Sequence, residues 1–457
     1  MHTPRPLLRP ARFRLILSGI FLLLSAVACT AVSPLRHSPV EKPDQAGETN
    51  NKNIKDFFLY GDFIHKNNVH TVLFNRKGFE LAPPIIRLHS AEVVELRFDD
   101  LDADYKNYYF TVVHCNADWQ PSELSPFEYL DGFFEEQVTS YARSINTRVP
   151  YSHYSLEFPN ASMQPRVSGN YLLKVYLDGD PENLVLTRRF MVLEQLVQID
   201  ASVGMANLVT YRDTKQQISM EIHTGGYPVS NPQQDLRVVM TQNGRWDNAI
   251  TKLRPRSIIG NRLVYDHEDQ ALFDGGNEFR RFDTRTLRFL TERVAEINSS
   301  VRHWDVFLLP DQRRTFRRYS SDNDINGRFT IRNQDGRNDM LESDYAWVHF
   351  SLPMDAPLAS GGLYIMGELT HWHFSDANQM SYNYVEKKYE ISLLLKQGYY
   401  NYLYAFLEEG ETRADTGFIE GNHSITENDY SIYVYHRQPG TVYDRLIGIT
   451  HLNSSVQ

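Results

Sequence analysis

Cysteine is nearly absent from this chain: its 457 residues include only Cys29 and Cys115. Two cysteines cannot build the disulfide framework of a small secreted domain, so hydrophobic cores must hold the fold together. Short catalytic patterns are also missing, namely G-x-S-x-G, the P-loop, G-x-G-x-x-G and H-E-x-x-H. Nothing in the sequence therefore supports an enzyme, and we expect no catalytic residue and no cofactor.

Positive charge is in deficit, with 47 Lys and Arg against 57 Asp and Glu and a formal net charge of -10. The first 28 residues carry four arginines and no acid, followed by the apolar run 15–24 and the small-residue end "SAVAC". This pattern predicts a signal peptide over 1–28. Its removal takes away the four positive charges, so the formal charge falls from -10 to -14. We do not expect so acidic a chain to bind nucleic acid or anionic lipid through bulk electrostatics.

The residues around Cys29 leave two forms of processing open. Ala26 and Ala28 satisfy an A-x-A cleavage rule, whereas Cys29 directly after Ala28 also fits a bacterial lipobox, with Ala26 where Leu is usual. Cys29 is therefore a candidate lipidation site. No later segment reaches 18 apolar residues. We expect an exported protein that is soluble in the periplasm or tethered to a membrane only by lipid.

Aromatic residues are abundant, with 27 Tyr and 25 Phe. They fall in short runs with β-branched residues between turn sequences, which predicts an all-β fold of tandem immunoglobulin-like or early-set β-sandwich domains. Changes in composition give the expected boundaries: a flexible tether over 29–52, an N-terminal sandwich over 53–195, a middle sandwich over 196–310, a linker over 311–328, a C-terminal early-set immunoglobulin-like domain over 329–440 and a tail over 441–457.

The stretch "HCNADW" at 114–119 places a histidine beside the second cysteine. His114 and Cys115 end a predicted strand, where adjacent side chains point to opposite faces, so the imidazole cannot deprotonate the thiol. We expect Cys115 to be buried, and His114 and Asp118 to fix a turn by hydrogen bonds. Paired acids such as Asp99 and Asp100 lie in polar stretches and indicate solvated charge.

Two patterns resemble parts of metal sites. "DNDINGRFTIRN" begins like a calcium loop, with Asp322, Asp324, Asn326 and Gly327 in place, but the twelfth residue is Asn333 where a bidentate Glu is required. His371 and His373 flank Trp372, and no third ligand is evident near them. We interpret the first pattern as a solvated linker turn and the two histidines as surface residues, and we predict no metal.

A carbohydrate site is an alternative for the C-terminal domain. Trp372 and the alternating Tyr400, Tyr402 and Tyr404 offer rings that could stack on sugars if they are exposed. Sandwich cores need rings at the same spacing, so a core is the competing interpretation.

Four motifs in order carry a more specific resemblance: "VVHCNADWQPSELSPFEYLDGF", "SINTRVPYSHYSLEFPN", "SGNYLLKVYLDGD" and "RRFMVLE", with "ISLLLKQGYYNYLYAF" near the end. They resemble the type IX secretion system plug proteins, formerly a domain of unknown function, over about 55–440. The resemblance implies a non-enzymatic periplasmic protein of a Bacteroidota-type envelope. Such a protein would close the periplasmic opening of the giant SprA-type outer-membrane β-barrel translocon while that barrel is idle.

The resemblance gives no catalytic residue to carry over. The residues that match its signature are expected to be structural: loop packing for the first group of them, and a tight turn at Gly169 before a strand. They are His114, Cys115, Asp118, Trp119, Tyr151, His153, Tyr154, Ser168, Gly169 and Asn170.

Overall fold

The first lobe is a β-sandwich, and its strands bury alternate side chains in the core. In β8 (Ser152–Phe158), for example, every second side chain is buried. Two sheets face each other across this core. One has the order β1-β3-β8-β7 and the other β2-β11-β10-β4-β6. The remaining bounds are β1 (Val69–Arg76), β2 (Ile85–Arg87), β3 (Val94–Asp100), β4 (Tyr108–Cys115), β6 (Glu136–Gln137), β7 (Ser140–Arg143), β10 (Gly169–Leu177) and β11 (Leu184–Leu193).

The computed structural model describes residues 61–455, all within one compact unit. The expected signal peptide, tether and lipidation site at Cys29 lie outside these residues.

Small elements complete the first lobe, including a two-stranded sheet beside a single helical turn. They are α2 (Pro126–Tyr129), β5 (Leu130–Gly132) and β9 (Met163–Pro165).

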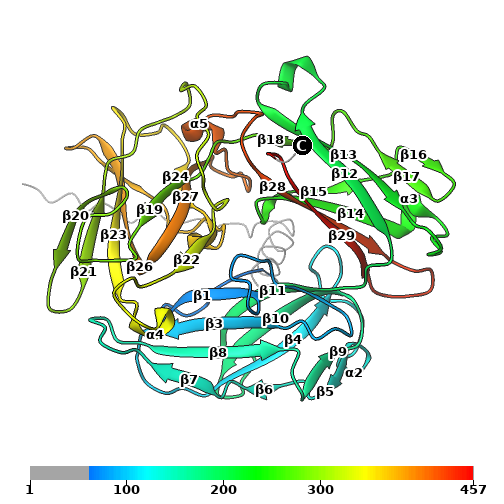
Figure 1. Ribbon diagram of the computed structural model, residues 1–457, viewed down its shortest axis with the longest axis horizontal. Coiled ribbons are helices and arrows are strands. Elements are labelled where there is room, and N and C mark those ends of the chain that lie inside the picture. The colour runs from blue at the N-terminus through cyan, green and yellow to red at the C-terminus, as the bar shows by residue number, and fades with distance from the viewer. Residues whose placement is uncertain (1–60, 456–457) are drawn as a thin grey trace, which may run out of the picture. The chain divides into compact units, whose positions relative to one another are not determined.

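The second lobe is assembled from two segments far apart in the sequence. Its sheets have the orders β12-β13-β17-β16, with β18 on β13, and β15-β14-β28-β29. β14 pairs with β28 from Leu236 opposite His436 to Gln242 opposite Tyr430, and Figure 1 shows β28 and β29 in red beside the green β14. The bounds are β12 (Gln198–Met205), β13 (Lys215–His223), α3 (Pro232–Asp235), β14 (Leu236–Gln242), β15 (Arg245–Leu253), β16 (Ser257–Ile259), β17 (Arg262–Tyr265), β18 (Leu272–Asp274), β28 (Asp429–His436) and β29 (Arg445–Asn453).

The third lobe lies between β18 and β28 in the sequence. One sheet has the order β19-β27-β22, with β24 also paired to β27, and the other has the order β20-β21-β23-β26-β25. The bounds are β19 (Arg280–Asp283), β20 (Val294–Ser299), β21 (Trp304–Leu308), β22 (Phe329–Ile331), α4 (Asp339–Glu342), β23 (Tyr345–Pro353), β24 (Gly362–Met366), β25 (Ser381–Asn383), β26 (Lys388–Lys396), β27 (Gly398–Leu407) and α5 (Gly417–Glu420). Single 3₁₀ turns lie at Val209–Tyr211 and Glu368–Thr370.

The all-β sandwich class predicted from the sequence is confirmed. The strand pairing, however, divides the chain differently from the expected boundaries. The expected tail over 441–457 contains β29, and the middle sandwich needs β28 and β29 to complete its second sheet. The physical reason is that a strand's partner is set by long-range packing, which leaves no mark in local composition.

The segment 311–328, expected as a linker, is built into the third lobe. Its Asp311 is buried and receives hydrogen bonds from Tyr402 and Tyr404, and it pairs with Arg280 at 2.8 Å. Arg314 pairs with the buried Glu420 at 2.7 Å. The charged residues that suggested a solvated linker instead form ion pairs, and these pairs offset the free-energy cost of burying the charges.

Helices contribute little. Among residues 61–455, no helix has the length and apolar character that a membrane crossing requires.

Candidate functional site at the lobe junctions

The signature residues of the first lobe gather where it meets the second. His114, at the end of β4, is almost completely buried. Its Nδ1 lies 2.9 Å from Ser122 Oγ and its Nε2 lies 3.3 Å from the carbonyl of Ser168. Burial lowers the pKa of His114 to about 4, so the ring is neutral at pH 7. These contacts join the end of β4 to Ser122 and to the segment before β10, and the expected role in fixing a turn stays a prediction.

A side chain at position 169 would collide with His114 and Asp444, which explains the glycine there. It begins β10 with φ +148°, and a Cβ at this position would lie 2.3 Å from His114 Nε2 and 3.0 Å from the carbonyl oxygen of Asp444. The backbone of the second lobe thus comes within van der Waals distance of the first. Gly169 is the first residue of β10, so the expected tight turn before a strand stays a prediction, and its lack of a side chain makes room for the junction.

Asp444 anchors the second lobe to the HCNADW loop. Its carboxylate accepts the backbone N–H of Ala117 at 3.0 Å and pairs with Arg437 at 2.8 Å. Its own N–H donates to Asn116 Oδ1 at 3.2 Å. Asp118 is exposed and lies 3.9 Å from Arg237 of β14. The loop packing predicted for this group is thus packing between lobes.

Two further signature residues repeat this pattern. Asn170 donates to the carbonyl of Asn116 at 3.0 Å and accepts the hydroxyl of Tyr435, in β28, at 2.9 Å. Ser168 donates to Glu194 at 2.8 Å, and Glu194 pairs with Arg445 of β29 at 2.8 Å.

Cys115 has no reactive setting. It is fully buried, and burial raises the pKa of its thiol to about 12, so no thiolate forms near neutral pH. Its Sγ lies 3.7 Å from the carbonyl of Val113, and its neighbours in the core include Leu172 and Tyr435.

Trp119 closes the same junction with an unusual backbone. It has φ +65° and is buried, its ring meets Trp246 of β15 edge to face at 5.2 Å, and the Arg189 guanidinium lies 4.7 Å above it. Cation–π and aromatic contacts of this kind stabilise desolvated surfaces. Two adjoining cavities, of about 460 and 560 Å³, share Trp119, Arg189, Trp246, His371 and Trp372 among their lining residues.

A second junction joins the first lobe to the third. Tyr151 donates its hydroxyl to the carbonyls of Met340 and Ser343 at 2.8 and 2.9 Å. His153 Nδ1 lies 2.6 Å from Asp99, and Asp99 is fully buried against Lys396 of β26, whose Nζ is 2.6 Å away. Tyr154 stays within its own lobe, where it accepts the N–H of Lys106.

Asp99 is the centre of this junction. Burial by itself would raise its pKa, but the charge of Lys396 and the hydrogen bond from His153 outweigh burial and hold the pKa below its usual value. Tyr345 adds a hydrogen bond at 2.7 Å. Asp99 and Asp100 were expected as solvated charge, and both are buried. No local pattern marks Lys396, because its partner Asp99 lies 297 residues away in the chain.

The residues of the alternative sugar platform are mostly hidden. Tyr400, Tyr402 and Tyr404 in β27 are at most 2% exposed, because they lie in the hydrophobic core of the third lobe. They pack in the core or, for Tyr402 and Tyr404, bond to Asp311. A sugar cannot reach them. Trp372 is half-buried at the two cavities.

His371 and His373 also differ from their expected place on an open surface. His373 Nε2 lies 2.8 Å from the carbonyl of Asp62, and its ring stacks on Phe63 at 4.2 Å. Arg188 donates to His371 Nδ1 at 3.3 Å, and burial, with the charge of Arg188, lowers the pKa of His371. Both histidines hold the third lobe to the first.

The calcium-like loop does not fold around its own side chains. Asp322 is exposed and pairs with Arg281, while Asn333 donates to the carbonyl of Glu342. Asp324 accepts the N–H groups of Phe279 and Asn326, and Gly327 has φ +79°. As an EF-hand-type loop the pattern is therefore incomplete.

Comparison with known proteins agrees with the signature. The family model described as "Type 9 secretion system plug protein 1st domain" matches residues 69–194. A solved structure of a hypothetical protein from Parabacteroides merdae ATCC 43184 is 39% identical, and the match covers 86% of this chain and 99% of that one with a TM-score of 0.84. The chain belongs to the type 9 secretion system plug protein family.

Among curated proteins, the search returned no match. The plug family match spans the first lobe, and the likeness to the Parabacteroides merdae protein extends over nearly that protein's whole length. Membership of the plug family makes this protein a component of type IX secretion in the cell envelope.

Proposed function

We propose that this plug-family protein occludes the periplasmic opening of the outer-membrane β-barrel translocon of the type IX secretion system while no cargo is in transit. The observation that carries the proposal is the family match of the first lobe, the lobe whose signature residues also bind the other two. The action is steric, and no bond is made or broken.

The rigid connection between the lobes supports this role, because a protein that blocks an opening must keep its shape. Buried polar contacts tie the first lobe to the second at Asp444 and to the third at Asp99. Because each is desolvated and fully partnered, shearing one lobe against another would expose unpaired charge. Stiff sandwiches joined in this way behave as a single obstacle.

The exposed surface also fits a protein partner better than a sugar. Large apolar side chains are exposed on more than one lobe, with Phe127 at 72% and Phe133 at 67% in the first and Tyr384 at 76% in the third. Phe127 packs edge to face on Phe134 at 4.6 Å, and the exposed Phe133 is the sequence neighbour of Phe134; we call these three residues the aromatic cluster of the first lobe. Exposed aromatic clusters of this kind favour protein interfaces.

The alternative was a glycan-binding protein that uses the C-terminal domain. Three of its four rings are buried in β27, so a stacking platform would have to be rebuilt around Trp372 alone. Buried aromatic residues cannot stack on a sugar without unfolding the strand.

The proposal places the protein in the periplasm against the outer membrane. The N-terminus leaves two forms of processing open, lipidation of Cys29 and simple cleavage. A lipid on Cys29 would hold the protein near the translocon and raise its effective concentration there.

The first test is affinity purification of the tagged mature protein from native outer membranes, followed by mass spectrometry. We expect an outer-membrane barrel much larger than this chain, in comparable molar amount. The tag alone is the control. Retention on a polysaccharide column without any barrel would reject the proposal and make Trp372 the residue to substitute.

A second test separates occlusion from other roles at the translocon. Deleting the gene should make cells permeable to a large antibiotic that the outer membrane normally excludes. The effect should vanish when the translocon gene is deleted as well. A permeability defect that persists in the double deletion would contradict the proposal.

A further inference from the structure

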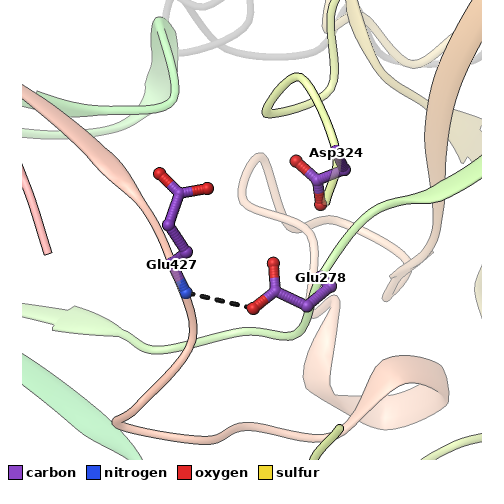
Figure 2. Close-up of side chains that lie close together, drawn as sticks. All are labelled: Glu278, Asp324 and Glu427. Atoms are coloured by element: carbon purple, nitrogen blue, oxygen red, sulfur yellow. Dashed lines mark hydrogen bonds between the residues drawn. The ribbon is translucent and has the colours of Figure 1, made fainter. Parts of the chain in front are cut away.

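Three carboxylates from three separate segments meet at the junction of the second and third lobes. Glu278 lies on the segment leading from β18 to β19, Asp324 on the loop before β22, and Glu427 on the segment leading into β28. One oxygen from each lies within 4.8 Å of the other two. Figure 2 shows the carboxylates of Asp324 and Glu427 on either side of Glu278.

Glu278 supplies the observation that points to a ligand. It is 2% exposed, and its Oε1 accepts hydrogen bonds from the hydroxyl of Tyr319 and the N–H of Glu427. Its Oε2 is buried without any hydrogen-bond partner and points into the space between the other two carboxylates (Figure 2). A buried carboxylate oxygen left unpaired is costly, and native structures normally satisfy it.

Neighbouring basic groups do not neutralise the cluster. The arginines beside it in the sequence pair elsewhere, Arg281 with Asp322 and Arg328 with Asp429. Glu427 receives only the amides of Asn326 and Asn453. Within residues 61–455, no ion pair involves any of the three carboxylates. The guanidinium of Arg314 donates to the backbone carbonyl of Glu278 at 2.8 Å and pairs with Glu420, so the three carboxylates lie together without a charged partner of their own among residues 61–455.

We propose that Glu278, Asp324 and Glu427 bind a calcium ion that ties the second and third lobes together. Calcium takes carboxylate, carbonyl and water oxygens at about 2.3–2.6 Å, so ligands on opposite sides of the ion lie about 4.8 Å apart, as the cluster allows. The ion would pair the free Oε2 of Glu278, and water would complete its shell. The ion would then hold both segments that connect the second and third lobes to the Asp324 loop of the third lobe.

Two of the three carboxylates have raised pKa values, with burial as the main cause. Burial, with the carboxylates of Glu278 and Glu427, raises the pKa of Asp324 to about 7. Burial likewise raises the pKa of Glu278. Without a cation, the competing explanation is a proton shared between Glu278 and Asp324, and the experiment must separate the two.

The test is thermal unfolding of the mature protein in EDTA and in 10 mM CaCl₂ or MgCl₂, with isothermal titration of CaCl₂. We expect one calcium per chain, a Kd of about 10⁻⁵ to 10⁻³ M, and a Tm higher in calcium by roughly 2–6 °C. Glu278→Gln and Asp324→Asn should lose that rise. Asp322→Asn, which removes an exposed acid two residues from Asp324, is the matched control and should keep it.

A second readout uses Tb³⁺, an ion that occupies calcium sites and emits when an aromatic ring beside it is excited. Tyr319 contacts Glu278, so wild type should show sensitised emission that calcium displaces. Absence of both emission and a calcium-dependent Tm in wild type would overturn the proposal in favour of the shared proton. A calcium effect that survives in Glu278→Gln and Asp324→Asn would also overturn it, because the ion would then lie elsewhere.

Discussion

His114 shows how burial fixes the chemistry of a single residue. Its imidazole is enclosed by Ser122, the carbonyl of Ser168 and the backbone of Gly169, so it must enter the fold uncharged. The residue contributes order at a lobe junction and no reactivity. Its adjacency to Cys115 in the sequence has no chemical meaning, because the two side chains serve different contacts.

The first prediction concerns pH. Since the folded pKa of His114, about 4, lies below the ordinary value of 6.5, its stabilising contribution is present above pH 6.5 and is lost as pH falls toward 4. Between pH 7 and 4.5 this amounts to about 2 kcal/mol. Urea unfolding of His114→Gln should show a shallower loss over that range than wild type. The exposed His89→Gln is the matched control, and equal slopes for His114→Gln and wild type would contradict the assignment.

Asp99 and Lys396 give the second prediction. Lys396→Met removes the ammonium group that pairs with the fully buried carboxylate of Asp99 and should lower the free energy of unfolding by about 3 kcal/mol. The double variant Asp99→Leu with Lys396→Met should recover part of that loss, because no buried charge is then left unpaired. Urea midpoints measure both. A cost below about 1 kcal/mol for the single variant would show that His153 and Tyr345 suffice to hold Asp99.

The strands β28 and β29, near the end of the chain, stabilise both the second lobe and its connection to the first. Leu446 and Ile447 in β29 are fully buried, and their carbonyls accept the N–H groups of Glu194 and Leu196. β29 thus completes a sheet of the second lobe and also holds the segment that leaves the first.

The third prediction follows from that dependence. Ending the chain at Gly440 removes two buried aliphatic side chains, worth about 2–5 kcal/mol each, together with a full strand of hydrogen bonds. This approaches the whole stability of a typical domain, about 5–15 kcal/mol. The truncated protein should be insoluble or cleaved within the second lobe during limited proteolysis, whereas a chain ending at Ser455 should behave as wild type. A soluble, protease-resistant truncation would show that β14 needs no β28–β29 hairpin.

For the whole molecule, the proposed contact with a translocon makes the aromatic cluster of the first lobe a natural point of attachment. Phe127 and Phe133 are the most exposed large apolar residues within the family-matched 69–194. Desolvated aromatic side chains dominate the energy of most protein interfaces.

The fourth prediction is that Phe127→Ser with Phe133→Ser reduces recovery of the barrel in affinity purification by about tenfold, with an unchanged Tm. Both side chains are exposed, so the fold does not depend on them. Phe316→Ser, at 96% exposure in the third lobe, is the matched control. Unchanged recovery with the first-lobe variant would place the attachment on another face.

The fifth prediction uses the charge of the molecule. A formal charge of -10 for the full chain suits a basic rim, so raising NaCl from 50 to 500 mM should weaken binding to the purified translocon by about tenfold. An equal rise in sucrose should have no such effect. An affinity independent of salt would mean that apolar contacts alone hold the complex.

Local sequence determined the all-β class, because the alternation of apolar residues is written into each strand, as in β8. It also marked the HCNADW and SGN motifs, and in the second of them the close approach of His114 and Asp444 requires the glycine at 169. What those motifs contact was decided only in three dimensions. The partner of Asp99 is Lys396, that of Ala117 is Asp444, and that of Glu278 is Glu427 with Asp324.

The same division holds for the lobes. Composition shifts suggested three consecutive domains, whereas the pairing of β14 with β28 makes the second lobe discontinuous. Strand order, buried ion pairs and the three-carboxylate cluster all depend on residues brought together across hundreds of positions. Their energies come from desolvation and packing, which exist only after the chain has folded, so no local pattern in the sequence could encode them.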